Sequence, residues 1–291
     1  MAETLKMLSA AYRKSGRAME GMLFHPFHLS RWLKLGFLSF LEQLPLAGII
    51  IFSNLGVLVP HLHLVQKHAR MLPSLLFVLP LLTLFGLCFQ LLFFYLSSRA
   101  AFAYLQMPLR MEDSVWNALL PFARAGAGYF LWRVAFWMLG SLSFTLLLGI
   151  PMLFLSSSRP AVAWAGSGVL GLTALVFFLV LGFIALLTRD FVVPLMWARG
   201  LPLLKAWDAL LGHLSRHPLR FILFYLARLA LGLLVVLGLL TMGFLTCCLL
   251  FIVVLIPGIG QAVLQPVFLF FRFFPLAFLE ELDPGTRYFP E

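Results

Sequence analysis

Long apolar runs restrict what this chain can fold into more than any other feature of its sequence. Six of them are long enough to cross the hydrocarbon core of a bilayer, which takes about 20 residues of α-helix. They lie near residues 30–54, 72–98, 129–155, 163–189, 219–245 and 257–281. Only 11% of the residues are charged, against about 25% in a typical soluble domain. The sequence therefore predicts an all-α polytopic membrane protein with six transmembrane helices.

Lysine and arginine are distributed unevenly between the segments that join these runs. All but three of the 21 lie near the termini or in the stretches 99–133 and 189–228. The three others are Lys67, Arg70 and Arg159. Because basic loops stay in the cytoplasm, we expect a bacterial cytoplasmic (inner) membrane protein with both termini cytoplasmic. The net charge of +10 then indicates contact with anionic lipid headgroups, and we expect no nucleic-acid partner.

A sequence repeat relates parts of the chain. The pattern W-x-A-L-L begins at Trp116 and recurs at Trp207, and a weaker third copy aligns His25–Pro26 with His217–Pro218. In each copy a basic amphipathic stretch precedes two apolar runs. Self-similarity at a fixed spacing is typical of repeated architecture, although membrane helices also resemble one another through composition alone.

The repeat predicts one membrane domain, 1–291, built from three parallel helical hairpins. The repeat units are about 1–105, 106–197 and 198–291. Each is expected to begin with a cytoplasmic amphipathic helix that lies in the membrane interface, with its basic residues toward lipid phosphates. These helices are predicted near residues 4–20, 111–124 and 203–216.

Several polar side chains interrupt the apolar runs at depths where an isolated charge costs roughly 2.5–3.5 kcal/mol. They include Glu42, Arg133, Arg228 and Arg272, with Gln265 nearby in the sixth run. Glu42 is a candidate partner for Arg228 or Arg272 in a structural ion pair. Alternatively, the arginines bind an anionic group such as a lipid phosphate, or they extend to the membrane surface. One acid against three arginines favours the anionic ligand.

A second set of charges recurs where the second, fourth and sixth runs end. Arg99, Asp190 and Glu281 occupy equivalent repeat positions, and Arg189 and Glu280 are adjacent to two of them. If the repeat is preserved in space, these side chains form one layer and pair between helices. The alternative is that they are ordinary interfacial charges, solvated at the membrane surface.

Sequence signatures of catalysis and of metal binding are missing. The chain has no GxxxxGK[ST], HExxH or GxSxG motif. His61, His63 and His68 have no carboxylate or cysteine nearby, so we expect an outer loop there and no metal site. The three cysteines lie in apolar runs and are expected to be small buried residues. The sequence therefore predicts no cofactor and favours a protein that is not an enzyme, and a membrane-embedded enzyme ranks third among the hypotheses.

Three stretches carry a family resemblance. They are YLSSRAAFAYL (95–105), TRDFVVPLMWARG (188–200) and IPGIGQAVLQPVFLFFR (256–272). They resemble a group of uncharacterised bacterial six-span membrane proteins, which is similar in turn to the membrane domain of some glycerophosphodiester phosphodiesterases. The resemblance implies an inner-membrane protein with interfacial helices. The phosphodiesterase catalytic barrel has no counterpart in this chain, so its activity is not implied.

The leading functional hypothesis is binding or transport of an anionic amphiphile or lipid. Arg228, Arg272 and Arg133 are expected to contact the headgroup, with Glu42 and Gln265 beside them. The alternative is a non-catalytic scaffold or accessory subunit of a membrane protein complex, with a protein partner in the membrane. The sequence leaves open the ligand, the oligomeric state, any energy coupling and the conformation of 243–260.

Overall fold

The computed structural model describes residues 2–58, 72–155, 160–283, 285 and 287–289, and within these ranges the chain is helical apart from short connections. The helices are α1 (Ala2–Phe24), α2 (Leu29–Leu58), α4 (Leu72–Leu109), α5 (Val115–Leu119), α6 (Ala123–Leu155), α7 (Pro160–Leu187), α8 (Val193–Arg199), α9 (Leu203–Arg216), α10 (Pro218–Leu245), α11 (Leu249–Leu255), α12 (Ile259–Val263) and α13 (Gln265–Leu282), with a 3-10 turn η2 (Leu120–Phe122) and a π-helical turn η3 (Thr188–Val192). The expectation of an all-α protein holds for the described part of the chain.

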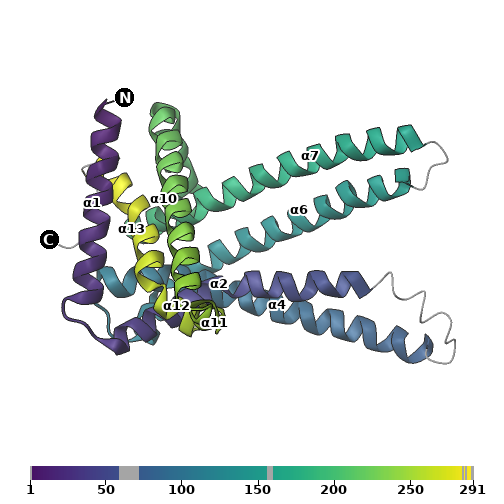
Figure 1. The fold of residues 1–291 in the computed structure, drawn as a ribbon, viewed down its shortest axis with the longest axis horizontal. Coiled ribbons are helices and arrows are strands. Elements are labelled where there is room, and N and C mark those ends of the chain that lie inside the picture. Colours follow the sequence, from purple (N-terminus) through teal and green to yellow (C-terminus); the bar gives the residue numbers. More distant parts are fainter. Residues whose placement is uncertain (1, 59–71, 156–159, 284, 286, 290–291) are drawn as a thin grey trace.

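The first four apolar runs fold into two helical hairpins that extend side by side from one end of the molecule (Figure 1). One hairpin consists of α2 and α4, the other of α6 and α7, and α4 packs against α6. A helix is the conformation in which such apolar segments can hydrogen-bond all their own backbone groups away from water. The helix α4 continues to Leu109, past the predicted end near residue 98.

Three of the described helical segments are long and apolar enough to cross a membrane. They are Leu84–Leu109, Gly168–Arg199 and Pro218–Leu245. Their length and composition indicate a membrane protein. The sequence predicts six transmembrane helices, which is more than the three that this finding supports.

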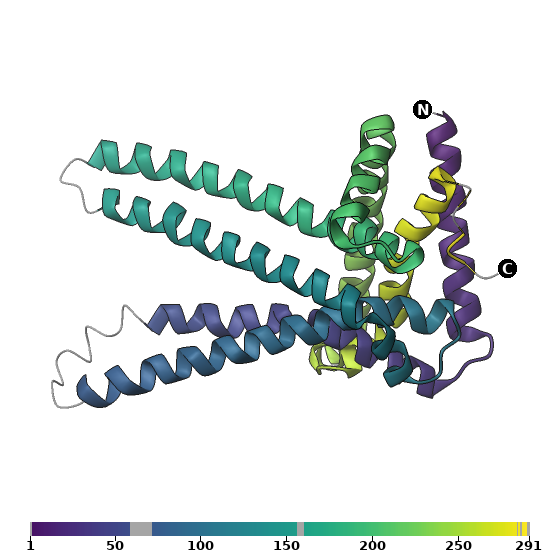
Figure 2. The ribbon, with the colours of Figure 1, turned by 180° about the vertical axis from the view of Figure 1, so that it is seen from behind.

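The last two predicted runs form α10, α11, α12 and α13, which we call the third unit. This unit lies across the two hairpins (Figure 2). α10 is continuous and ends at a turn in which Cys247 and Cys248 both have positive φ values. The run predicted at 257–281 is broken at Leu264 into α12 and α13. Gly258 precedes α12 with a φ of +83°, which glycine adopts without steric cost. The third unit therefore departs from the predicted set of three parallel hairpins.

Two of the three predicted surface helices are present as long helices. α1 covers the predicted stretch 4–20, and α9 begins and ends with the predicted stretch 203–216. The middle one is wrong in length, because only α5 and η2 precede the start of α6 at Ala123. Ser114 caps α5 by accepting a hydrogen bond from the Asn117 backbone N–H at 3.4 Å, so the preceding residues cannot belong to the same helix.

The apolar face of α1 is buried in the protein instead of facing lipid. Leu8, Ala11 and Leu23 are almost fully buried, and α1 packs along α13. Aromatic side chains of η3, α10 and α13 continue this core; they include Phe191, Phe221, Phe224, Phe274 and Phe278. The core thus lies at the base of the hairpins, where all three units meet.

Replacing Gly36 of α2 with alanine tests the contact between α2 and α12. A Cβ atom on Gly36 would lie 2.8 Å from the Ala262 Cβ and 2.9 Å from its Cα, so the two helices must separate. We expect Gly36→Ala to lower the free energy of unfolding by about 1–3 kcal/mol, although alanine favours helix. Thermal unfolding in detergent measures this.

The matched control is Gly21→Ala on α1, where nothing lies within 4 Å of an added Cβ. Here the gain in helix propensity is unopposed, so we expect stabilisation of up to about 1 kcal/mol. Equal shifts of the two variants in the same direction would contradict the close contact of α2 with α12.

Candidate functional site

A buried carboxylate, Glu42 of α2, lies at the point where the hairpins meet the third unit. Its Oε1 atom is 3.0 Å from the Arg189 Nε of η3 and 3.5 Å from the Arg272 Nη1 of α13. The Glu42 side chain is 6% exposed and that of Arg272 is 3% exposed. One carboxylate therefore joins three elements that are far apart in the sequence.

The π-helical turn η3 leaves a backbone carbonyl free to accept a hydrogen bond from Arg272. The Val193 N–H donates to the Thr188 carbonyl, five residues back, which bypasses the Arg189 carbonyl. Pro194 follows and has no N–H to offer. The Arg189 carbonyl accepts instead from Arg272 Nη1, at 3.0 Å. A local break in one helix thus creates an acceptor for an arginine of another.

The other terminal nitrogen of Arg272, Nη2, donates to the Ala101 carbonyl of α4 at 2.9 Å. This guanidinium therefore contacts α2, η3 and α4 at once. Such backbone contacts cannot be read from a sequence, because every residue carries the same carbonyl group.

Ser97 of α4 links Glu42 to a further arginine. The Ser97 hydroxyl donates to the Glu42 backbone carbonyl at 2.5 Å and accepts from Arg133 Nη1 at 2.6 Å. The Arg133 guanidinium also lies 5.6 Å from the centre of the Phe94 ring and 5.3 Å from that of Tyr129. Ser97 is not among the residues predicted from the sequence, where its only signal is a small hydroxyl side chain within an apolar run.

A second ion pair lies beside the first. Arg228 of α10 places Nη1 2.5 Å from the Asp190 Oδ2 of η3, and these side chains are 15% and 2% exposed. The guanidinium also lies 5.7 Å from the centre of the Phe271 ring. Arg228 therefore pairs with Asp190, and of the two arginines predicted from the sequence as partners of Glu42 it is Arg272 that contacts this carboxylate.

Counting the charges of this group gives an excess of arginine. Four arginines (Arg133, Arg189, Arg228 and Arg272) surround two carboxylates (Glu42 and Asp190), which leaves a net charge of +2. We call these six residues the arginine cluster. The Arg189 side chain is 42% exposed and Arg133 is partly exposed, so the accessible part of the cluster is cationic.

Gln265, also expected at the site, joins α13 to α4 instead. Its Nε2 donates to the Tyr104 hydroxyl at 2.5 Å, and the glutamine is fully buried. Tyr104 was not singled out from the sequence, because a tyrosine at the end of an apolar run is usual at a membrane interface. The pair holds the start of α13 against α4.

The charges at equivalent repeat positions do not pair with one another. Arg99 donates to the backbone carbonyls of Leu119 and Leu120, at 3.0 and 3.4 Å. Glu280 pairs with Lys14 of α1 at 2.7 Å. Glu281 lies at a surface depression that is also lined by Lys6 and Arg220. Arg189 and Asp190 take their partners from α2 and α10, as described above.

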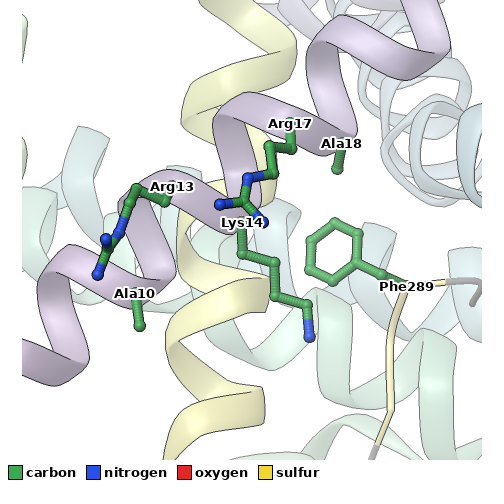
Figure 3. A pocket seen from close by; sticks show the side chains of 6 residues that line it. All are labelled: Ala10, Arg13, Lys14, Arg17, Ala18 and Phe289. Atoms are coloured by element: carbon green, nitrogen blue, oxygen red, sulfur yellow. The ribbon is translucent and has the colours of Figure 1, made fainter.

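A separate groove of about 550 Å³ lies on the surface of α1 (Figure 3). Its lining residues are Ala10, Arg13, Lys14, Arg17, Ala18 and Phe289. Lys14 is already paired with Glu280 and lies 5.5 Å from the centre of the Phe289 ring. Burial raises the pKa of the neighbouring Tyr288 phenol to about 12. The groove is a cationic surface, distinct from the arginine cluster.

The described residues contain no group of three or more His, Cys, Asp or Glu side chains placed to hold a metal ion. His61, His63 and His68 lie outside the described residues.

Comparison with known proteins gives one match. The model of a protein family of unknown function, DUF7544, matches residues 8–279. No curated protein matches the chain, and no solved structure does. The family match spans both hairpins, the third unit and every residue of the arginine cluster.

Replacing Arg272 with leucine tests whether the arginine cluster holds the three units together. The change removes a partner of Glu42, the donor of the Arg189 carbonyl and the second donor of the Ala101 carbonyl, which keeps its hydrogen bond within α4. Breaking a buried ion pair on one side costs about 3–5 kcal/mol, and we expect a loss of this size in unfolding experiments in detergent. The control Arg124→Leu, at an exposed position of α6, should stay within about 0.5 kcal/mol of wild type. Equal stability of the two variants would contradict the assigned role.

A double variant tests the pair of Arg228 and Asp190. Arg228→Leu alone should destabilise the protein, because Asp190 is left buried without its nearest cation. In Arg228→Leu/Asp190→Leu no charge is left behind, and buried pairs replaced by apolar residues are often neutral. We therefore expect the double variant to unfold at a higher temperature than the single one. A double variant that is less stable than Arg228→Leu would argue against direct pairing.

Proposed function

We propose that this chain, which belongs to that family of unknown function, is a multi-pass protein of the bacterial cytoplasmic membrane that binds an anionic amphiphile or lipid. Its headgroup contacts Arg189 and Arg133, the accessible arginines of the cluster. The observation that carries the proposal is the net charge of +2 at a site where the two carboxylates already have partners.

The position of Arg133 along α6 supports a lipid as the ligand. From residue 134 to 155 the helix has 22 residues, which span about 33 Å at 1.5 Å per residue. The hydrocarbon core of a bilayer is about 30 Å thick. If α6 crosses the membrane, Arg133 lies at the level of the headgroups of one leaflet. By the distribution of lysine and arginine, this is the cytoplasmic leaflet.

The chemistry of the guanidinium group supports an anionic headgroup. Arginine matches the oxygens of phosphates and carboxylates with two parallel N–H donors, and such charge-assisted bonds are stronger than neutral ones. Arg272 and Arg228 are largely buried, so they support the site and do not contact the ligand. Arg189 also pairs with Glu42, but its side chain is 42% exposed and can reach a headgroup as well. This assignment revises the expectation that all of the intramembrane arginines contact the headgroup.

Neutralising the accessible arginines tests the proposal. We compare Arg189→Gln/Arg133→Gln with wild type for the amount of anionic lipid that co-purifies in mild detergent, quantified by mass spectrometry. Glu42 keeps Arg272 as a partner, and thermal unfolding of the variant in detergent measures whether the fold persists. Loss of even one charge-assisted hydrogen bond of about 1.5–3 kcal/mol should lower lipid occupancy at least about tenfold at limiting lipid.

Arg124→Gln is the matched control, because it removes a charge from an exposed position of the same helix outside the cluster. It should retain the lipid. Equal occupancy in all variants would refute the assigned site. A protein that co-purifies at fixed stoichiometry, with no bound lipid, would instead favour the scaffold or accessory subunit that the sequence left open.

A further inference from the structure

We infer that the third unit does not cross the membrane as a third hairpin. α10 lies within the leaflet on the side of the chain termini, where its apolar surface contacts acyl chains, and α13 lies outside the hydrocarbon core. The inference rests on the proposal that the α2–α4 and α6–α7 hairpins cross the membrane.

The segment between α10 and α13 lies on the same side of the molecule as the chain termini, whereas in a hairpin that crosses the membrane it would lie on the opposite side. Such a hairpin would place the residues before α13 on the membrane face opposite to the termini. Ala262 of α12 instead meets Gly36, near the start of α2, where an added Cβ would lie 2.8 Å away. Gln265 contacts Tyr104, near the end of α4, at 2.5 Å. Both contacts are with helix ends on the side of the termini.

The start of α10 lies on that same side. Arg220, in its first turn, pairs with Glu3 of α1 at 3.6 Å. Near the middle of the helix, Arg228 is tied to Asp190 in η3. Because its beginning and the segment after its end both contact elements on one side, α10 runs along the membrane. This agrees with its direction across the two hairpins (Figure 1).

The packing of α1 on α13 excludes α13 from the hydrocarbon core. The two helices are in contact along their length. The opposite face of α1 exposes charged residues from one end of the helix to the other; they are Glu3, Lys6, Arg13, Arg17 and Glu20. If α13 crossed the membrane, α1 would carry these charges into lipid, which is unfavourable at every one of these positions.

The exposed side chains of α10 indicate that this helix lies in an apolar environment. Beyond Tyr225 the helix is apolar on nearly every side and has few protein contacts. Leu229, Leu233, Leu237 and Phe244 are between 60% and 71% exposed. A helix that is hydrophobic all round is stable only in an apolar environment, and its own backbone hydrogen bonds allow it to lie in lipid at any tilt. Acyl chains of the adjacent leaflet provide that environment.

The native cysteines at the end of α10 allow a direct test. Cys247 and Cys248 are exposed, and in a crossing hairpin they lie on the face opposite to the termini. We would label them with a membrane-impermeant maleimide in a Cys88→Ser background, in intact cells and in inverted vesicles. The reference is Arg159→Cys, in the connection between α6 and α7, in a variant without native cysteines.

The inference predicts that Arg159→Cys reacts from outside in intact cells, whereas Cys247 and Cys248 react there at less than about a tenth of their level in detergent. Reaction of all three from the same face overturns the inference. If Arg159→Cys reacts only in inverted vesicles, the proposed orientation fails, and the inference then requires that Cys247 and Cys248 react in inverted vesicles at less than about a tenth of their level in detergent.

A second measurement distinguishes lipid from a second copy of the chain on α10. A nitroxide attached at Leu237→Cys, in a variant without native cysteines, should be more accessible to dissolved oxygen than to a water-soluble nickel chelate. This pattern identifies acyl chains as the surroundings. Protection from both reagents would show that protein covers this face and would overturn the assignment to lipid.

Discussion

The buried ion pairs of Glu42 are the interaction on which the rest of the structure depends. A carboxylate inside an apolar bundle is unfavourable unless cations and hydrogen bonds compensate it. Here the compensation comes from Arg189 and Arg272, which belong to two different units of the chain. The three units must therefore meet at Glu42, because its charge is neutralised only when Arg189 and Arg272 lie beside it.

The polar contacts around Glu42 extend this constraint to the backbone. The π-helical turn and Pro194 free the Arg189 carbonyl, and Arg272 is the donor that satisfies it. Polar contacts of this kind hold helices together in membranes, where lipid removes much of the hydrophobic drive for association. The same arrangement leaves the accessible side of the cluster cationic. In the function proposed above, the buried Arg272 and Arg228 have a structural role, whereas Arg189 both pairs with Glu42 and contacts the headgroup.

The sequence alone determined most of the local structure. The lengths of the apolar runs predict α2, α4, α6, α7 and α10, because a helix pairs the backbone groups of such a segment within the segment itself. The amphipathic patterns of α1 and α9 were equally readable, since their periodicity is a property of neighbouring residues. The presence of charged residues at unusual depth, including Glu42 and Arg272, was also evident.

The tertiary structure decided which of these residues meet. Arg228 pairs with Asp190 and Arg272 with Glu42, because the third unit lies across the hairpins and brings different helix faces together than a parallel repeat would. The break at Leu264 and the packing of α1 on α13 produce that orientation. Hydropathy records how apolar a segment is, but not its direction, and so only the fold could assign these charges to their partners.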